Sequence, residues 1–218
     1  MDRLPDMNEL QKYGVNRDQW EGIRQTLYDT QAYAAAGQTQ LTFFAVPKGQ
    51  GGKTLSDTNM TLAGQLPAMQ VFMATSIECI VYPTVPAVAA ANPSAFGAQA
   101  VAAQINDAYL LARTGNLELT VGSKPYLQEA PLGRFPGKTH YQVNAALSDS
   151  TTVAGNQQSR IAYGYAAGRP YLLTPANLFL TSSQNFTVTL NWPEGVQAIT
   201  NPCRIQVVLD GFLYRRSQ

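Results

Sequence analysis

Histidine is nearly absent from this chain, which limits the chemistry that its side chains can perform. The 218 residues include a single histidine, His140, and no G-x-S-x-G motif that would present a serine nucleophile. A cupin-like metal site needs several imidazoles, and a serine–histidine–aspartate triad would have to use His140. We therefore expect no catalytic, cofactor-binding or metal-binding residue. His140 is interpreted as a loop residue without a chemical role.

Charged residues are scarce as well. They make up 13% of the chain, about half of the usual share of about 25%, and the net charge is +1. So weak a field does not attract nucleic acid or an anionic membrane. The one basic cluster, Arg215 and Arg216, is interpreted as a solvated chain terminus. We expect no specific nucleic-acid binding and an uncharged polar surface, much of it covered by neighbouring molecules.

Long apolar runs and a signal peptide are missing too. No run is long enough to span a bilayer, and the opening MDRLPDMNEL has no apolar segment. Synthesis and folding are accordingly expected in a cytoplasm. Cys79 and Cys203 each lie in an apolar stretch, and we expect them to be buried free thiols. A disulfide between two strands stays open as an alternative that would need an oxidising compartment.

The stretch PKGQGGKT (47–54) resembles a nucleotide-binding P-loop in its second half only. Gly52 and Lys53 stand where that motif requires them, but Pro47 occupies the position of the first glycine and has no N–H to offer a phosphate. The following residues, 55–67, lack the apolar period of the helix that completes such a site. Nucleotide binding is therefore the weaker interpretation.

We interpret the same loop as a flexible connection at one end of the fold. Its glycines allow different conformations in non-equivalent surroundings. Lys48 and Lys53 are expected to contact solvent or an adjacent copy of the chain. Loss of Lys53 is accordingly expected to leave the fold intact.

Two helices are predicted. Residues 16–37 have apolar residues at helical spacing, at Trp20, Ile23 and Leu27. We expect segment 1–37 to form a polar arm and helix that reaches a neighbouring copy, with packing on the chain's own sheet as an alternative of equal weight. The second helix is expected near 95–114, as an insertion over the end of a sandwich.

Most of the remaining chain shows the alternation of strands. The clearest case is 185–193, where Phe186, Val188, Leu190 and Trp192 alternate with polar residues. In 69–83 one face is predicted to carry Val71, Met73, Ile77, Cys79 and Val81, with Glu78 on the other. Further strands are expected at 40–46, 116–133, 141–147, 159–165, 169–175, 177–183 and 202–216. About eight strands without a βαβ rhythm predict an antiparallel sandwich or barrel.

Two further functions depend on particular side chains. The carboxylates that could pair across a sheet as glycosidase acids are Glu78, Glu118, Glu129, Glu194 and Asp210. The aromatic residues that could form a sugar-stacking surface are Tyr163, Tyr165, Tyr171, Trp192, Phe212 and Tyr214. Core positions account for most of these aromatics without further assumptions. A carbohydrate- or receptor-binding sandwich, such as a virion spike, decoration protein or lectin-like module, is the main alternative function.

Two stretches carry a resemblance to a known family. GKTLSDTNMTLAGQLPAMQVFMATSIECIVYP (52–83) and VVLDGFLYRR (207–216) resemble segments of the major capsid proteins of tailless icosahedral bacteriophages, in which a polar loop with a Gly-Gln-Leu-Pro turn precedes a long strand. The resemblance implies a mainly all-β fold, an antiparallel eight-stranded jelly-roll sandwich with an N-terminal helix and one inserted helix. Residues 38–218 would form its single domain.

The function that this resemblance implies is structural and not enzymatic. The chain would be a capsid subunit that self-assembles into an icosahedral shell around the viral genome. Its partners would be copies of itself, in trimers, pentamers or hexameric capsomers, and other virion proteins, with an internal membrane left open. The location would be the virion, after assembly in the host cytoplasm.

Overall fold

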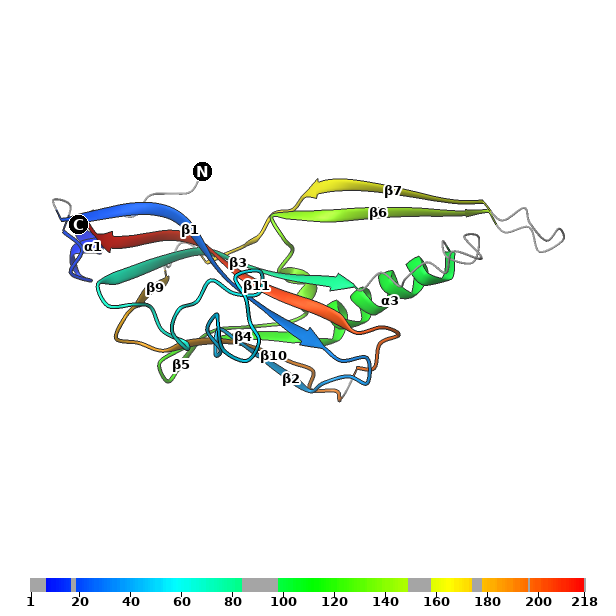
Figure 1. Cartoon of the computed structure of the whole chain (residues 1–218), viewed down its shortest axis with the longest axis horizontal. Coiled ribbons are helices and arrows are strands. Elements are labelled where there is room, and N and C mark those ends of the chain that lie inside the picture. The colour runs from blue at the N-terminus through cyan, green and yellow to red at the C-terminus, as the bar shows by residue number, and fades with distance from the viewer. Residues whose placement is uncertain are drawn as a thin grey trace.

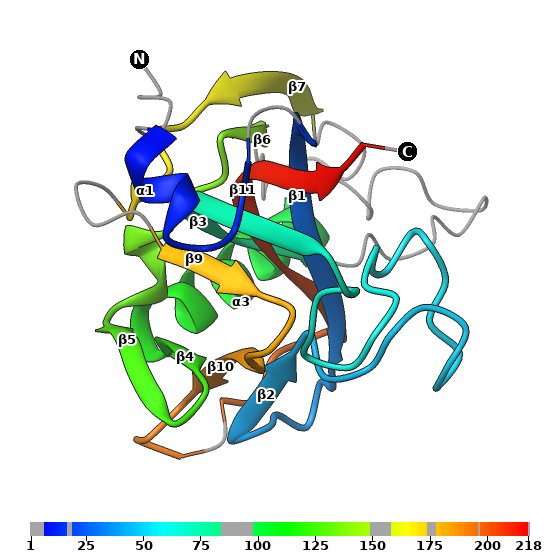
Figure 2. The ribbon, with the colours of Figure 1, turned by 90° about the vertical axis from the view of Figure 1, so that its left-hand side faces the viewer.

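The chain is mainly β, as the sequence predicts. The computed structural model describes residues 7–16, 19–83, 98–148, 158–173, 178–195 and 197–217. Within these ranges eleven strands form two antiparallel sheets, which pack face to face, and a separate two-stranded hairpin (Figures 1 and 2).

The two sheets of the sandwich have five and four strands. The five-stranded sheet has the order β1-β11-β3-β8, and β9 also pairs with β3; its strands are β1 (Trp20–Tyr33), β3 (Gln70–Pro83), β8 (Tyr171–Leu172), β9 (Leu178–Thr181) and β11 (Cys203–Arg216). The four-stranded sheet has the order β2-β10-β4-β5; its strands are β2 (Gln40–Phe43), β4 (Asn116–Val121), β5 (Lys124–Glu129) and β10 (Phe186–Asn191). Every one of these pairings is antiparallel.

The remaining elements lie outside the two sheets; they are α1 (Met7–Gln11), α3 (Ala98–Thr114), the short 3-10 helix η1 (Leu132–Arg134), β6 (Thr139–Ser148) and β7 (Gln158–Ala167). The inserted helix is confirmed as α3, although residues 95–97 of its predicted range lie outside the described residues. The β6–β7 hairpin and α3 run out from the end of the sandwich opposite α1 and the last residues of β11 (Figure 1). No described helix is both long and apolar enough to cross a membrane.

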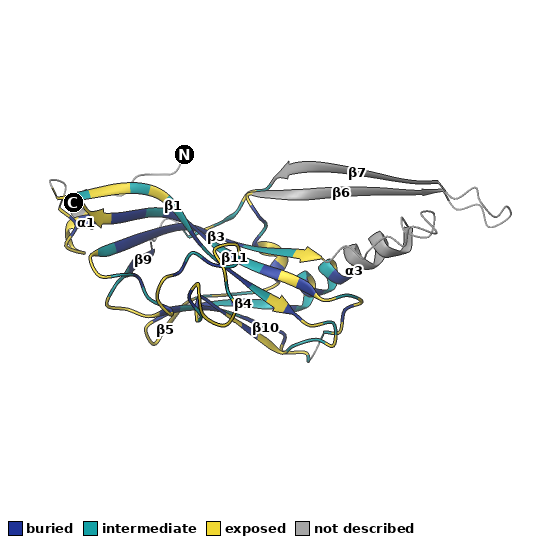
Figure 3. Ribbon diagram, in the orientation of Figure 1, coloured by how far each residue is buried: buried dark blue, intermediate teal, exposed yellow. Residues whose placement is uncertain are grey.

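The core fills the space between the two sheets (Figure 3). Along β10, Phe186, Val188 and Leu190 are buried and the threonines between them are half-buried, which confirms the predicted alternation. Trp192 continues this row at 1% exposure. Its ring meets that of Tyr33 edge-on, with 4.9 Å between the centroids. Burial in this core determines which face of each sheet points inward.

The predicted helix over 16–37 is wrong, because residues 20–33 form β1, an edge strand that pairs with β11 along its whole length. Ile23 and Leu27 are four residues apart, a spacing that places them on one face of either a helix or a strand. A helix would place Trp20 on that face as well, whereas the strand places it on the opposite face. It packs against a second apolar cluster, whereas Ile23 and Leu27 pack in the main core between the sheets. The buried residues of the second cluster are Leu10, Val15, Val71, Met73, Phe179 and Tyr214.

The N-terminal residues pack on their own sheet. Leu10 and Val15 are buried in the second cluster, and the ring of Tyr13 stacks on Phe179 with 4.4 Å between the centroids. The alternative of packing within the chain is therefore confirmed for α1 and β1, and the contact of this segment with a neighbouring copy stays a prediction; residues 1–6 lie outside the described residues. Since β1 belongs to the sandwich, a domain boundary at residue 37 cuts through it.

The predicted faces of β3 are correct for one half of the strand only. Ile77, Cys79 and Val81 face the main core as predicted, but Val71 and Met73 pack in the second cluster on the opposite face. A side-chain period of two cannot change faces unless a residue is inserted.

A β-bulge supplies that extra residue. Ser76 pairs with Asp210 and Ala74 pairs with Gly211, so that Thr75 has no partner residue of its own on β11. The Thr75 hydroxyl donates instead to the backbone oxygen of Asp210, at 3.0 Å. Asp210 follows Leu209, which faces the main core, so it lies on the outer face of the five-stranded sheet.

Candidate functional site

Two carboxylates lie side by side on the outer face of the five-stranded sheet. Glu78 pairs with Val208 and Ser76 pairs with Asp210, so Glu78 and Asp210 are diagonal neighbours on adjacent strands. Each is only 5% exposed. Two like charges buried this close together require hydrogen-bond donors or positive charges as partners.

Lys138 and Arg24 supply those partners. The backbone N–H of Lys138 donates to Glu78 Oε2 at 2.8 Å, and its Nζ donates to Asp210 Oδ2 at 2.9 Å. Arg24 Nη2 donates to the same oxygen of Asp210 at 3.0 Å. We call these four residues, Arg24, Glu78, Lys138 and Asp210, the hairpin root.

The name reflects the position of Lys138, which directly precedes β6. Gly168 directly follows β7, and its N–H donates to the carbonyl oxygen of Lys138 at 3.0 Å. A few residues further on, the N–H of Leu173 donates to the carbonyl oxygen of Thr75. The hairpin therefore leaves the sandwich from a fixed point held by backbone bonds and buried charges.

The two carboxyl groups of the hairpin root differ in their affinity for protons. Burial raises the pKa of Glu78; the N–H of Lys138 offsets part of this rise, and the charge of Asp210 adds to it. Burial also acts to raise the pKa of Asp210, but hydrogen bonds and charges from Lys138 and Arg24 outweigh it and hold that pKa below its ordinary value. As the pH falls, Glu78 is protonated first.

This difference predicts a pH-dependent effect of Glu78→Gln. Because the pKa of Glu78 is raised in the folded chain, wild-type stability is lost as the pH rises through that raised value. Glutamine removes this loss and can still accept the Lys138 N–H. Urea unfolding should show the variant gaining stability relative to wild type as the pH rises above 4.5, the ordinary pKa of a glutamate. Asp210→Asn is the control with the opposite sign. The pKa of Asp210 is lowered in the folded chain, so its ionised form stabilises the fold at pH values above the ordinary pKa of an aspartate, and this stabilisation is lost in acid. The variant should therefore lose stability relative to wild type at neutral pH.

A second buried charge pair fastens the glycine-rich loop. Asp29 is fully buried on β1, forms an ion pair with Lys53, and accepts the N–H of Phe44 at 2.7 Å. The Lys53 side chain is 10% exposed. The prediction that Lys53 contacts solvent or another copy is therefore wrong, because its ammonium neutralises a carboxylate in the core.

The loop's own carbonyl oxygens accept its N–H groups. Lys48 donates to Met60, Gly49 donates to Lys53, and Lys53 donates to Gln50, at 2.8–3.0 Å. A P-loop would direct such groups at a phosphate. With the Lys53 ammonium bound to Asp29 as well, the structure agrees with the sequence in disfavouring a nucleotide site here.

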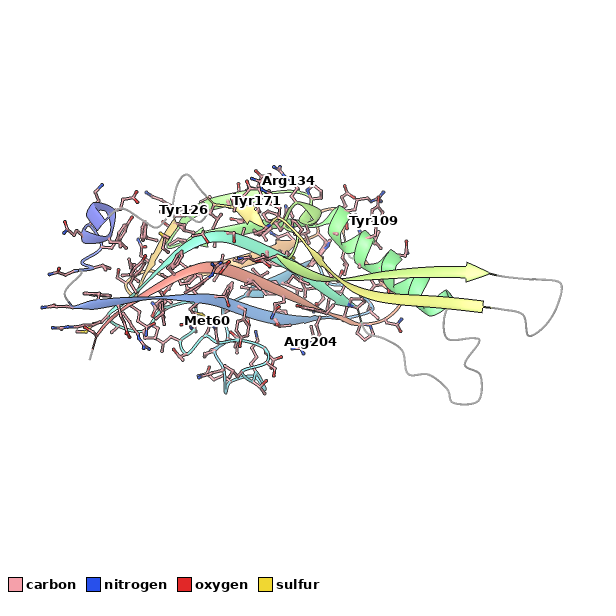
Figure 4. All side chains as sticks on the ribbon, turned by 90° about the horizontal axis from the view of Figure 1, so that it is seen from above. Met60, Tyr109, Tyr126, Arg134, Tyr171 and Arg204 are labelled. Atoms are coloured by element: carbon pink, nitrogen blue, oxygen red, sulfur yellow. The ribbon has the colours of Figure 1, made fainter. Side chains whose placement is uncertain are left out.

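The same loop covers part of the free edge of β1. Asn59 accepts the N–H of Tyr28 at 3.1 Å and donates to the carbonyl oxygen of Thr26 at 2.7 Å, and Thr58 donates to the carbonyl oxygen of Tyr28 at 3.0 Å. Seen from above, Met60 of this loop lies on one long side of the molecule, away from Arg134 and Tyr171 on the other (Figure 4). The loop therefore takes up hydrogen-bonding groups that another strand could use.

Of the five candidate carboxylates, the structure brings together only Glu78 and Asp210. Glu129 is the last residue of β5, where it pairs with Arg134 and accepts the hydroxyl of Tyr171. Glu118 lies on β4 and Glu194 in the turn after β10. His140, predicted to be a loop residue, is instead in β6 opposite Ala166.

The four candidate aromatic residues whose side chains the structure describes do not gather on one surface. Trp192 is in the main core, whereas Phe212 and Tyr214 belong to the second cluster. Tyr171 packs on Phe135 with 5.0 Å between ring centroids and lies under the guanidinium of Arg134 (Figure 4). The side chains of the two tyrosines of β7 lie outside the described residues.

Sequence reasoning missed three buried or anchoring charges: Asp29, Asp107 and Lys138. Asp107 of α3 accepts the N–H and hydroxyl of Thr200 at 3.0 and 3.1 Å, which ties the helix to the loop before β11. Asp29 was detectable only once its segment was recognised as a strand, where it alternates in phase with Leu27. No local pattern distinguishes Lys138 or Asp107 from a solvated charge.

The two cysteines are free thiols, as predicted. Burial raises the pKa of Cys79 to about 12 and, with a smaller effect from Asp107, that of Cys203 to about 11.

Among the described residues no three His, Cys, Asp or Glu side chains are grouped so that they could hold a metal ion. Comparisons with protein-family models, curated proteins and solved structures gave no match.

Proposed function

We propose that this chain is a jelly-roll capsid subunit, which assembles with copies of itself and other virion proteins into an icosahedral shell around a viral genome. The observation that carries the proposal is the strand order. A jelly roll places its first, eighth, third and sixth strands in one sheet and its second, seventh, fourth and fifth in the other.

The two sheets can be read against that order. If the hairpin β6–β7 is treated as an insertion and β8 and β9 as one interrupted strand beside β3, the orders β1-β11-β3-β8/β9 and β2-β10-β4-β5 correspond to it strand by strand. Eight strand positions then remain. The long insertions, α3 and the hairpin, both extend from one end of the sandwich (Figure 1).

The fold alone is compatible with lectin and cupin domains as well as with capsid subunits. The capsid function is favoured by the stretches that resemble phage capsid proteins. In the structure, 207–216 lies within β11, and 52–83 comprises a loop followed by β3; these two strands are neighbours in one sheet. A surface with few charges also suits repeated contacts between identical copies.

Particle formation tests this proposal. The purified full-length chain, alone or co-expressed with the other virion proteins, is expected to form large closed particles of uniform diameter, because weak contacts repeated by symmetry add together. Sedimentation velocity followed by negative-stain electron microscopy measures this directly. A chain that stays monomeric at high concentration in both settings would contradict the proposal, and a small oligomer that binds a glycan array would indicate the lectin-like alternative.

A further inference from the structure

We propose that the β6–β7 hairpin is the surface through which one copy of the chain contacts the next, with a second copy of the same chain as its partner. The inference rests on the proposed capsid function and specifies which segment makes the contact. It also replaces the N-terminal arm expected from the sequence, since α1 and β1 pack on their own sheet.

The hairpin is the one sheet in the described structure that is not part of the sandwich. Its ten residue pairs extend from Thr139 opposite Ala167 to Ser148 opposite Gln158, and within the described residues no third strand joins them. Ten residues of strand span about 33 Å. Within the chain, α3 contacts β6. A two-stranded sheet is at best marginally stable alone in water, so a contact with a further molecule would add to its stability.

The register divides the hairpin into two unlike faces. At alternate pairs the sequence is apolar: Tyr141 opposite Tyr165, Val143 opposite Tyr163, and Ala145 opposite Ile161. The pairs between them hold small or polar residues: Gln142 opposite Gly164, Asn144 opposite Ala162, and Ala146 opposite Arg160. Such alternation is typical of a sheet with one buried face.

A second copy of the chain fits this face better than a charged partner does. Arg160 is the only Lys, Arg, Asp or Glu in the two strands, so the hairpin offers little to an acidic or basic macromolecule and little repulsion to its own copies. Alternation places about half of the residues of its two ten-residue strands on the apolar face, fewer than the roughly 20–30 residues per side of a standard specific interface, which fits a weak contact repeated by symmetry. The hairpin root fixes its starting point, which lowers the entropy cost of docking.

Removal of the hairpin gives the first test. Gly168 donates to Lys138 at 3.0 Å, so an Asn-Gly turn can join these residues in place of 139–167. We expect the shortened chain to fold with cooperative urea unfolding and to sediment as a monomer under conditions in which the full chain forms particles. If both chains assemble equally, only the hairpin proposal fails; if the full chain does not assemble, the capsid proposal fails. A shortened chain that does not fold would show that the sandwich itself needs the hairpin and would overturn the inference.

Paired charges on each face give the second test. Val143→Lys with Tyr163→Lys places two charges on the apolar face, and Asn144→Lys with Ala162→Lys places the same two charges on the other face as the matched control. The first pair is expected to reduce particle yield at least about tenfold, as a loss of about 1.4 kcal/mol would, while the control assembles. Equal yields from the two pairs would overturn the choice of face. Thermal unfolding at a concentration too low for assembly completes the test: a lower melting temperature for the first pair alone would mean that the chain itself covers this face, and the inference would fail.

Discussion

Replacement of Gly211 by alanine is expected to abolish folding or to lower the free energy of unfolding by more than about 4 kcal/mol. Gly211 lies at the β-bulge, where β11 approaches β3 closely. A Cβ atom at this position would stand 1.9 Å from the carbonyl oxygen of Met73 and 3.0 Å from the ring of Phe72. The oxygen belongs to the backbone, so relief requires the two central strands of the sheet to separate.

Gly133→Ala is the matched control for this substitution. A Cβ at Gly133 meets only the carbonyl oxygen of Ala112, at 4.0 Å, and the backbone there is not left-handed. Its effect on urea unfolding should stay within about 0.5 kcal/mol. If Gly211→Ala unfolds with wild-type stability, the close approach of β11 to β3 at the bulge is wrong.

The second large effect is expected for Asp29→Ala, which should lower the free energy of unfolding by about 3–5 kcal/mol. The substitution leaves the Lys53 ammonium, 10% exposed, without the carboxylate that neutralises it. It also removes the acceptor of the Phe44 N–H. Lys53→Met should be costly for the converse reason, contrary to the expectation from sequence that Lys53 is dispensable.

A double-mutant cycle separates this pair from an ordinary surface contact. Asp29→Leu combined with Lys53→Met should cost less than the sum of the two single changes, because no unpaired charge remains buried. The surface control is Glu21→Ala, which breaks the pair of Glu21 with Arg215, whose side chains are 44% and 52% exposed; its cost should be below about 1 kcal/mol. Additive losses in the cycle would show that Asp29 and Lys53 do not interact.

Local alternation was enough to predict most of the strands. Phe186, Val188 and Leu190 are buried as expected, because a half-buried strand in an antiparallel sheet repeats every two residues. It failed for β1, where Ile23 and Leu27 fit the helix and the strand periods equally. What decides the structure of β1 is its pairing with β11, almost the whole chain length away, and no local window of sequence contains that information.

The hairpin root shows the same limit for a site. Glu78 and Asp210 were both recognised as candidates, and the outward position of Glu78 followed from its place in the strand. Their proximity depends on the register of β3 against β11, two strands that are far apart in the sequence. The partner Lys138 comes from a third part of the chain, and nothing in the residues around it marks it as an anchor.

The loop that covers the edge of β1 has a consequence for the behaviour of the chain at high concentration. Asn59 and Thr58 occupy backbone groups of Thr26 and Tyr28 that a foreign strand would otherwise pair with. Open-ended stacking of chains into amyloid-like fibres is thereby hindered along this stretch. A protein that accumulates in many copies before they close into a particle would thus be protected from the competing, non-terminating form of self-association.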